Sequence, residues 1–75
     1  MKDGEKLLKV EGIVLESLPG LLFRVKFLSS GGEKEILAHL AGKLKLNRIK
    51  VIPGDRVVME MSNENDERSR IIRRL

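Results

Sequence analysis

Four positive side chains lie close together near the middle of the chain, in a stretch of eight residues without a carboxylate. They are Lys43, Lys45, Arg48 and Lys50. Clustered cations are typical of surfaces that contact nucleic-acid phosphates, where each contact releases condensed counterions. The alternative is a basic loop that only aids solubility. The clustering favours phosphate contact, and the interspersed apolar residues Leu44, Leu46 and Ile49 are expected to anchor the loop to the core.

A second positive stretch ends the chain, with four arginines and no acid between residues 68 and 75. Arginine offers a planar fork of donors that matches phosphate geometry and also stacks on bases. A phosphate-binding strand and a merely solvated tail fit this stretch equally well. Arg24 and Lys26 lie on the outward face of an earlier predicted strand. A solvated strand face explains them, unless folding brings them beside the central cluster.

The net charge of +4 is unevenly distributed along the 75 residues. Residues 1–38 are neutral overall, residues 39–56 carry +4, residues 57–67 carry −4 and residues 68–75 carry +4. Solvated surfaces usually interleave the two signs. This segregation therefore indicates one face suited to an anionic partner.

The composition offers little for catalysis or metal binding. There is no Cys, and His39 is the only His, so neither a disulfide nor a usual metal site is available. No nucleophile lies at a diagnostic spacing, and phosphate-loop and dinucleotide fingerprints are absent. We expect a non-enzymatic protein without metal or cofactor, in which His39 closes a strand or touches a ligand. The lack of Cys fits a reducing, cytoplasmic setting, and no apolar run suits a membrane helix.

The only aromatic residues, Phe23 and Phe27, alternate with polar residues in a predicted strand and are therefore expected in the core. Proteins that hold single-stranded nucleic acid usually stack bases on exposed aromatic rings. Without such rings, binding would rely on phosphates and on the shape of a folded RNA. Arg48 or the terminal arginines would then be the available stacking planes.

These side chains must be positioned by short strands joined at tight turns. Alternation of apolar and polar residues predicts strands, and a narrow leucine stripe predicts a short helix. The strands are expected at 8–14, 21–27, 36–40, 56–61 and 70–73, the helix at 41–47 and an extended segment at 49–52. Pro followed by Gly at 19–20 and 53–54 predicts type II turns, and Gly12 predicts a bend or close backbone approach. Polar loops are expected at 29–33 and 62–67.

The element order indicates an all-β fold, a five-stranded oligonucleotide-binding barrel with one short helix after the third strand. Closure would remove the exposed edges of an open sheet. An SH3-like barrel is the main alternative, and the segment after the third strand favours the former. We expect one domain over residues 1–75, with flexible ends at 1–5 and 74–75.

Several segments in order resemble bacterial translation initiation factor one. The opening hairpin is similar at residues 12–19 and at Phe23-Arg24-Val25. The centre is similar at His39-Leu40-Ala41-Gly42-Lys43, Asn47-Arg48-Ile49-Lys50 and Pro53-Gly54-Asp55-Arg56-Val57. The likeness extends over residues 6–61 and is weaker beyond.

The resemblance implies an S1-type barrel that binds the small ribosomal subunit at the aminoacyl-tRNA site, against 16S-type rRNA and a neighbouring ribosomal protein. It implies action together with initiation factors two and three. It also implies no association with membranes, and a monomeric state when the protein is off the ribosome. The RNA-binding residues carried over by position are Lys43, Lys45, Asn47, Arg48 and Lys50, with His39, Arg24 and Arg70 as weaker candidates.

The chain departs from the family pattern in three places. Arg48 stands where the family often has Tyr, and the loop at 28–35 looks longer than in the family. Residues 63–71 replace an aromatic-containing turn of the family. RNA contacts near the C-terminus are therefore the ones that the resemblance supports least. Two other functions stay open: a free-standing S1-like RNA chaperone, and a protein–protein adaptor whose basic surface meets an acidic partner.

Overall fold

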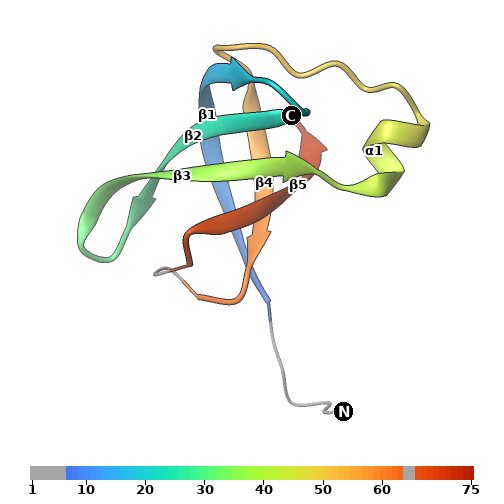
Figure 1. Ribbon diagram of the computed structural model, residues 1–75. Helices are drawn as coiled ribbons and strands as arrows, with labels where there is room; N and C mark the ends of the chain where they lie inside the picture. The colour runs from blue at the N-terminus through green and yellow to red at the C-terminus, as the bar shows by residue number, and fades with distance from the viewer. Residues whose placement is uncertain (1–6, 64–65) are drawn as a thin grey trace.

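The computed structural model describes residues 7–63 and 66–75, which form a closed barrel of five strands with one short helix (Figure 1). The expected flexible segment at 1–5 lies outside the described residues. The elements are β1 (Leu8–Leu18), β2 (Leu22–Ser29), β3 (Gly32–Leu40), α1 (Gly42–Leu46), β4 (Arg56–Met61) and β5 (Arg68–Arg74).

The order of strands around the barrel is β1-β2-β3-β5-β4, with β4 returning to β1. All neighbours are antiparallel except β3 and β5, which are parallel. A parallel pair needs a long crossover, and here residues 41–67, including α1 and β4, supply it. The closed barrel and the helix after the third strand confirm the predicted oligonucleotide-binding fold over the SH3-like alternative.

Strand β1 pairs with β2 along its second half and with β4 along its first half. The β1–β4 pairing joins the two ends of the strand order and closes the barrel. Gly12 lies where these pairings overlap, opposite both Phe27 and Val57. A Cβ atom at this position would lie 2.6 Å from Val25 Cγ1 and 2.8 Å from the Lys26 carbonyl oxygen. Only glycine fits such a close approach, which confirms the prediction for Gly12.

The turn between β1 and β2 is one residue longer than predicted. Gly20 has φ 82°, as a type II turn requires after Pro19, but Leu21 also has a positive φ of 58°. Leu21 is therefore a half-exposed turn residue, and β2 begins at Leu22, where it pairs with Leu18. The prediction that Leu21 opens the strand was wrong, because the apolar alternation continues through the turn.

The expected loop at 29–33 is shorter than predicted. Ser29 and Gly32 form the last pair of a β2–β3 hairpin, so only two residues connect the strands. The Ser29 hydroxyl donates to the Gly32 carbonyl at 2.7 Å and accepts the Gly31 N–H at 3.2 Å, which closes the turn. Strand β3 therefore begins four residues before the predicted 36–40, and β5 also extends beyond 70–73 at both ends.

The core consists of side chains that alternate inward along the strands, as the sequence pattern predicted. Both phenylalanines are buried, at 3% exposure each, so neither ring is available to a ligand. Leu44 from α1 and Val51 from the following segment complete the core, and Ile49 packs against it. Among the described residues, no helix has the length and apolar character needed to cross a membrane.

Candidate nucleic-acid interface

The basic loop, which we define as residues 42–50, follows β3 and lies at one end of the barrel (Figure 1). It starts from a fixed point, because the Ala41 N–H donates to the Ile71 carbonyl on β5 at 2.9 Å. Helix α1 then occupies its first half and buries Leu44 in the core. The predicted helix at 41–47 is thus confirmed with one residue fewer at each end.

The end of α1 is a Schellman motif, the pair of hydrogen bonds that commonly terminates helices. The Arg48 N–H donates to the Lys45 carbonyl at 3.1 Å, and the Ile49 N–H donates to the Leu44 carbonyl at 3.0 Å. The buried Leu44 and the partly buried Ile49 supply the apolar pair that often accompanies this motif. The loop backbone is therefore fixed on the barrel while its polar side chains stay in solvent.

Arg48 occupies the motif position at which glycine is usual. Its φ is 55°, in the left-handed region. That conformation costs a residue with a Cβ atom about 1 kcal/mol or more. The Arg48 side chain is exposed at this position, so its guanidinium faces solvent.

Leu46 does not anchor the loop, contrary to prediction. It is 85% exposed, whereas Leu44 is only 8% exposed. The physical reason is the helical geometry, since residues two apart do not share a helix face. Of the predicted stripe of Leu40, Leu44 and Leu46, the first two are buried, and the turn adds Ile49.

The four cations of the basic loop are all exposed. In residues 7–63 and 66–75, none of them takes part in an ion pair. Asn47, at the helix C-cap, is exposed as well. The loop thus presents four uncompensated positive charges and an amide from one short segment.

The first carboxylate along the chain after the loop, Asp55, is used by the backbone. Its Oδ2 accepts the Ile52 N–H at 3.0 Å, and its own N–H donates to the Ile52 carbonyl at 3.1 Å, which confirms the predicted turn at 53–54. Gly54 and Asp55 also exchange hydrogen bonds with Val14 of β1 at 2.8 and 2.9 Å. Because Asp55 is engaged in this turn, it ties the segment after the loop to the barrel.

The end of β5 joins the second basic stretch to the loop. Arg74 Nη1 donates to the Lys50 carbonyl at 2.9 Å, and the Leu75 N–H donates to the Arg56 carbonyl at 2.8 Å. Sequence reasoning did not single out Arg74, because nothing in the sequence connects it with a residue 24 positions away. The structure thereby makes Arg74 part of the same end of the barrel as Lys50.

His39 and Arg70 are paired positions on the parallel strands β3 and β5, and both side chains are exposed. Arg70 forms an ion pair with Glu60 of β4, which offsets its charge. The structure brings these two weaker candidates together on the outer face of the barrel. His39 precedes the basic loop by three residues, so this pair adjoins it along the chain.

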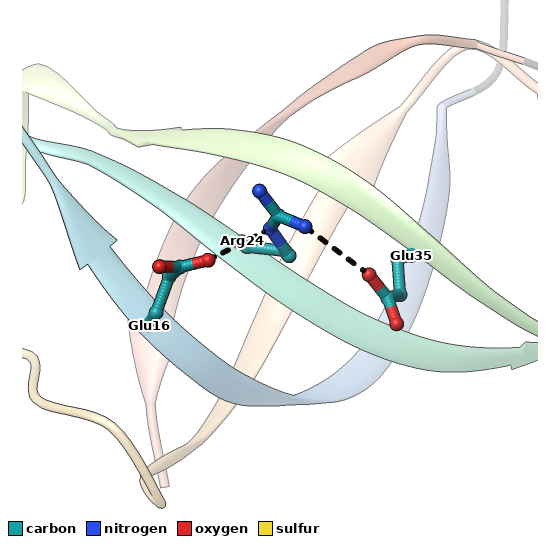
Figure 2. A network of polar contacts seen from close by, with 3 residues as sticks. All are labelled: Glu16, Arg24 and Glu35. Atoms are coloured by element: carbon teal, nitrogen blue, oxygen red, sulfur yellow. Dashed lines mark ion pairs between the residues drawn. The ribbon is translucent and has the colours of Figure 1, made fainter.

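Arg24 lies between two carboxylates on neighbouring strands (Figure 2). Its Nε is 3.1 Å from Glu16 Oε1 on β1, and its Nη1 is 3.7 Å from Glu35 Oε1 on β3. Lys26, on the same strand, forms one ion pair, with its Nζ 3.9 Å from Glu33 Oε2 on β3. In the described part of the chain, no hydrogen bond or ion pair connects Arg24 with the basic loop. Its surroundings match the solvated strand face rather than the central cluster.

A metal site was also sought among the described residues. No group of three or more His, Asp or Glu side chains among them is arranged to hold a metal ion. The candidate site itself consists of exposed cations, one amide and one exposed leucine on a hydrogen-bonded backbone.

Comparison with known proteins adds a family and two structural neighbours. The sequence model of the family described as Translation initiation factor 1A / IF-1 matches residues 1–75. The chain is similar to the solution structure of translation initiation factor one from the Wolbachia endosymbiont strain TRS of Brugia malayi, with 43% identity over 99% of this chain and 85% of that one, at a TM-score of 0.72. It is also similar to the crystal structure of YjeQ from Thermotoga maritima, with 31% identity over 91% of this chain and 23% of that one, at a TM-score of 0.68.

Proposed function

The chain belongs to the translation initiation factor 1A / IF-1 family, and from this premise we propose that its basic loop binds the small ribosomal subunit through rRNA at the aminoacyl-tRNA site. In this proposal the protein helps initiation factors two and three select the start site. It acts by binding rather than by catalysis.

One observation carries the proposal: the cations of the basic loop have no carboxylate partners within residues 7–63 and 66–75, while their backbone is fixed. Unpaired cations on a preorganised backbone bind phosphates without first breaking internal ion pairs. Lys43, Lys45, Arg48 and Lys50 supply the charge, and the Asn47 amide supplies a directional donor and acceptor.

The burial of both phenylalanines supports folded RNA as the ligand. An extended single strand is usually held by stacking on exposed aromatic rings, which the described residues do not provide. Folded rRNA offers closely spaced phosphates and a defined shape instead. His39 extends the proposed contact along β3, whereas Arg70 and Arg24 are expected to add little to it because carboxylates already pair with them.

The experiment is equilibrium binding of the protein to purified small ribosomal subunits, measured by co-sedimentation at several salt concentrations, with and without factors two and three. If each loop cation contacts a phosphate, the logarithm of the affinity falls steeply and linearly with the logarithm of the salt concentration. Cooperative binding with the other factors would support the joint role.

Two outcomes would contradict the proposal. Equal affinity for unstructured RNA and for the subunit would favour a general RNA chaperone. Failure to bind the subunit, together with capture by an acidic protein, would favour an adaptor.

A further inference from the structure

The first part of β3 has a partner strand on one side only. Strand β2 pairs with all of β3, whereas β5 begins to pair only where Arg68 meets Leu37. Over residues 32–36, β3 therefore pairs with no second strand in the described ranges 7–63 and 66–75. These residues lie toward the turn of the β2–β3 hairpin, away from α1 (Figure 1). They form a short sheet edge, which can serve as a template for an added strand.

The hydrogen bonds of β3 show which backbone groups this edge offers. The Ala41 N–H donates to the Ile71 carbonyl on β5, and backbone groups alternate between the two sides of a strand. Every second residue counted back from Ala41 therefore directs its N–H and C=O toward the β5 side. Glu35 and Glu33 belong to this set, and they lie before the point where β5 begins to pair. Their backbone groups are thus the ones that an added strand would meet.

A groove of about 450 Å³ adjoins this edge, and most of its charge is negative. Its lining consists of Arg24, Glu35, Ile36, Leu37, Asp66 and Glu67. Arg24 pairs with Glu35 from β2, yet the glutamate side chain remains 55% exposed. Glu33 remains 68% exposed beside Lys26 in the same manner. Cross-strand neighbours of opposite charge stabilise a sheet and like charges destabilise it, so the edge favours an added strand that carries cations.

We propose that this edge binds an extended segment of a partner protein that carries Lys or Arg at alternate positions. The segment would extend the sheet in line with β5, with hydrogen bonds to the backbone of Glu33 and Glu35. Its cations would lie beside the two carboxylates. A second copy of this chain is a poorer match, because two such edges in antiparallel register would place Glu33 opposite Glu35. The proposal goes beyond rRNA binding, since the edge lies away from the basic loop (Figure 1).

The test is an NMR titration of the full chain with a synthetic peptide of about ten residues that alternates Lys with Val or Thr. The amides of Glu33 and Glu35 are expected to shift and to exchange more slowly with solvent, because the peptide backbone covers them. Two N-methylated peptides separate strand addition from charge attraction. Methyl groups on the N–H groups that face the edge should lower affinity by about tenfold or more. Methyl groups on the alternate set should have little effect, since a strand presents only every second N–H to a neighbour.

A matched pair of variants tests the charges. Glu33→Gln combined with Glu35→Gln is expected to lower peptide affinity roughly three- to tenfold, because two cross-strand charge pairs are lost. The control, Glu11→Gln combined with Glu16→Gln, removes the same charge from β1 and should stay within about twofold of wild type. Circular dichroism would establish that both variants are folded.

Unchanged amides of Glu33 and Glu35 at millimolar peptide would overturn the proposal. Equal losses from the two N-methylated peptides, or from the two pairs of substitutions, would do the same, since binding would then not depend on this edge. Self-association of the chain in sedimentation without peptide, with the same amides protected, would assign the edge to a second copy instead. The assay contains no ribosomal subunit, so its outcome is independent of the proposed function.

Discussion

The basic loop and the carboxylate-paired face, which we define as Glu16, Arg24, Lys26, Glu33 and Glu35, use the same kinds of positive side chain in opposite ways. On the face, each cation lies within 4 Å of a carboxylate on an adjacent strand. In the loop, the four cations are exposed, and none has such a partner in the described ranges 7–63 and 66–75.

The difference follows from secondary structure. Antiparallel strands bring residues of distant sequence position into register, so a cation on β2 meets carboxylates on β1 and β3. The loop leaves the barrel after β3 and pairs with no strand, so its cations gain no such neighbours. Residue type therefore does not distinguish the two regions, whereas the presence or absence of a partner charge does.

The largest expected effect comes from removing the loop charges. Replacing Lys43, Lys45, Arg48 and Lys50 together by Gln should lower affinity for the small ribosomal subunit by roughly a hundredfold or more, because four proposed phosphate contacts are lost. The salt slope should fall by about four at the same time. Titration with purified subunits measures both.

A matched control removes four cations from the strands instead: Lys9, Arg24, Lys26 and Lys34 replaced by Gln. Both variants have the same net charge, so general attraction to RNA is equal in the two. The control should bind within about threefold of wild type, since long-range charge alone acts weakly at moderate salt. Equal losses in the two variants would show that net charge, and not the loop, determines binding.

Arg48→Gly separates binding from folding within the loop. It should raise the free energy of unfolding by up to about 1 kcal/mol, because glycine adopts the left-handed conformation freely, although its greater freedom in the unfolded chain offsets part of the gain. It should also weaken subunit binding by roughly fivefold or more, since a cation is lost. Denaturant unfolding and subunit titration give the two values.

The informative control for this change is Lys45→Gly, because Lys45 lies within α1 at an ordinary helical position. Glycine there should destabilise by roughly 0.5–1 kcal/mol. If Arg48→Gly destabilises the protein as much as Lys45→Gly does, the strain assigned to Arg48 is absent.

A smaller effect is expected from Arg74, which we propose positions the loop by donating to the Lys50 carbonyl. Arg74→Gln and Arg73→Gln remove the same charge from neighbouring residues of β5. Arg74→Gln should weaken subunit binding about threefold more than its neighbour does, because it also loses a hydrogen bond to the loop. In the free protein, only Arg74→Gln should speed amide hydrogen exchange at Lys50 and Val51, and unchanged exchange would leave Arg74 without a positioning role.

The barrel was predictable from the sequence because inward and outward side chains alternate along its strands, and because Pro-Gly pairs mark two of its turns. The β2–β3 hairpin was less predictable, since the run Ser29-Ser30-Gly31-Gly32 does not show which two residues form the turn, and the register of Ser29 with Gly32 decides it. The loop cations were found by their clustering alone, which does not depend on the fold.

Three features of the candidate site were not predictable for physical reasons. Exposure of Leu46 depends on where a helix of five residues starts, and a shift of one residue would turn another side chain inward. The hydrogen bond from Arg74 to Lys50 and the ion pairs of Arg24 join residues far apart in sequence, whose register is set only when the barrel closes. The positive φ at Arg48 contradicts the usual preference for glycine, so composition gives no sign of it.

The smallest effect is expected from Arg24, on the carboxylate-paired face. Arg24→Gln removes a cation that two carboxylates share, and it should lower the free energy of unfolding by a few tenths of a kcal/mol to about 1 kcal/mol, as is usual for exposed ion pairs. Added salt should shrink that difference, since screening weakens the pairs in the wild type. Subunit affinity should stay within about twofold of wild type. A loss of binding comparable to that of Lys45→Gln would place Arg24 in the RNA contact, and the distinction between paired and unpaired cations would then no longer locate the site.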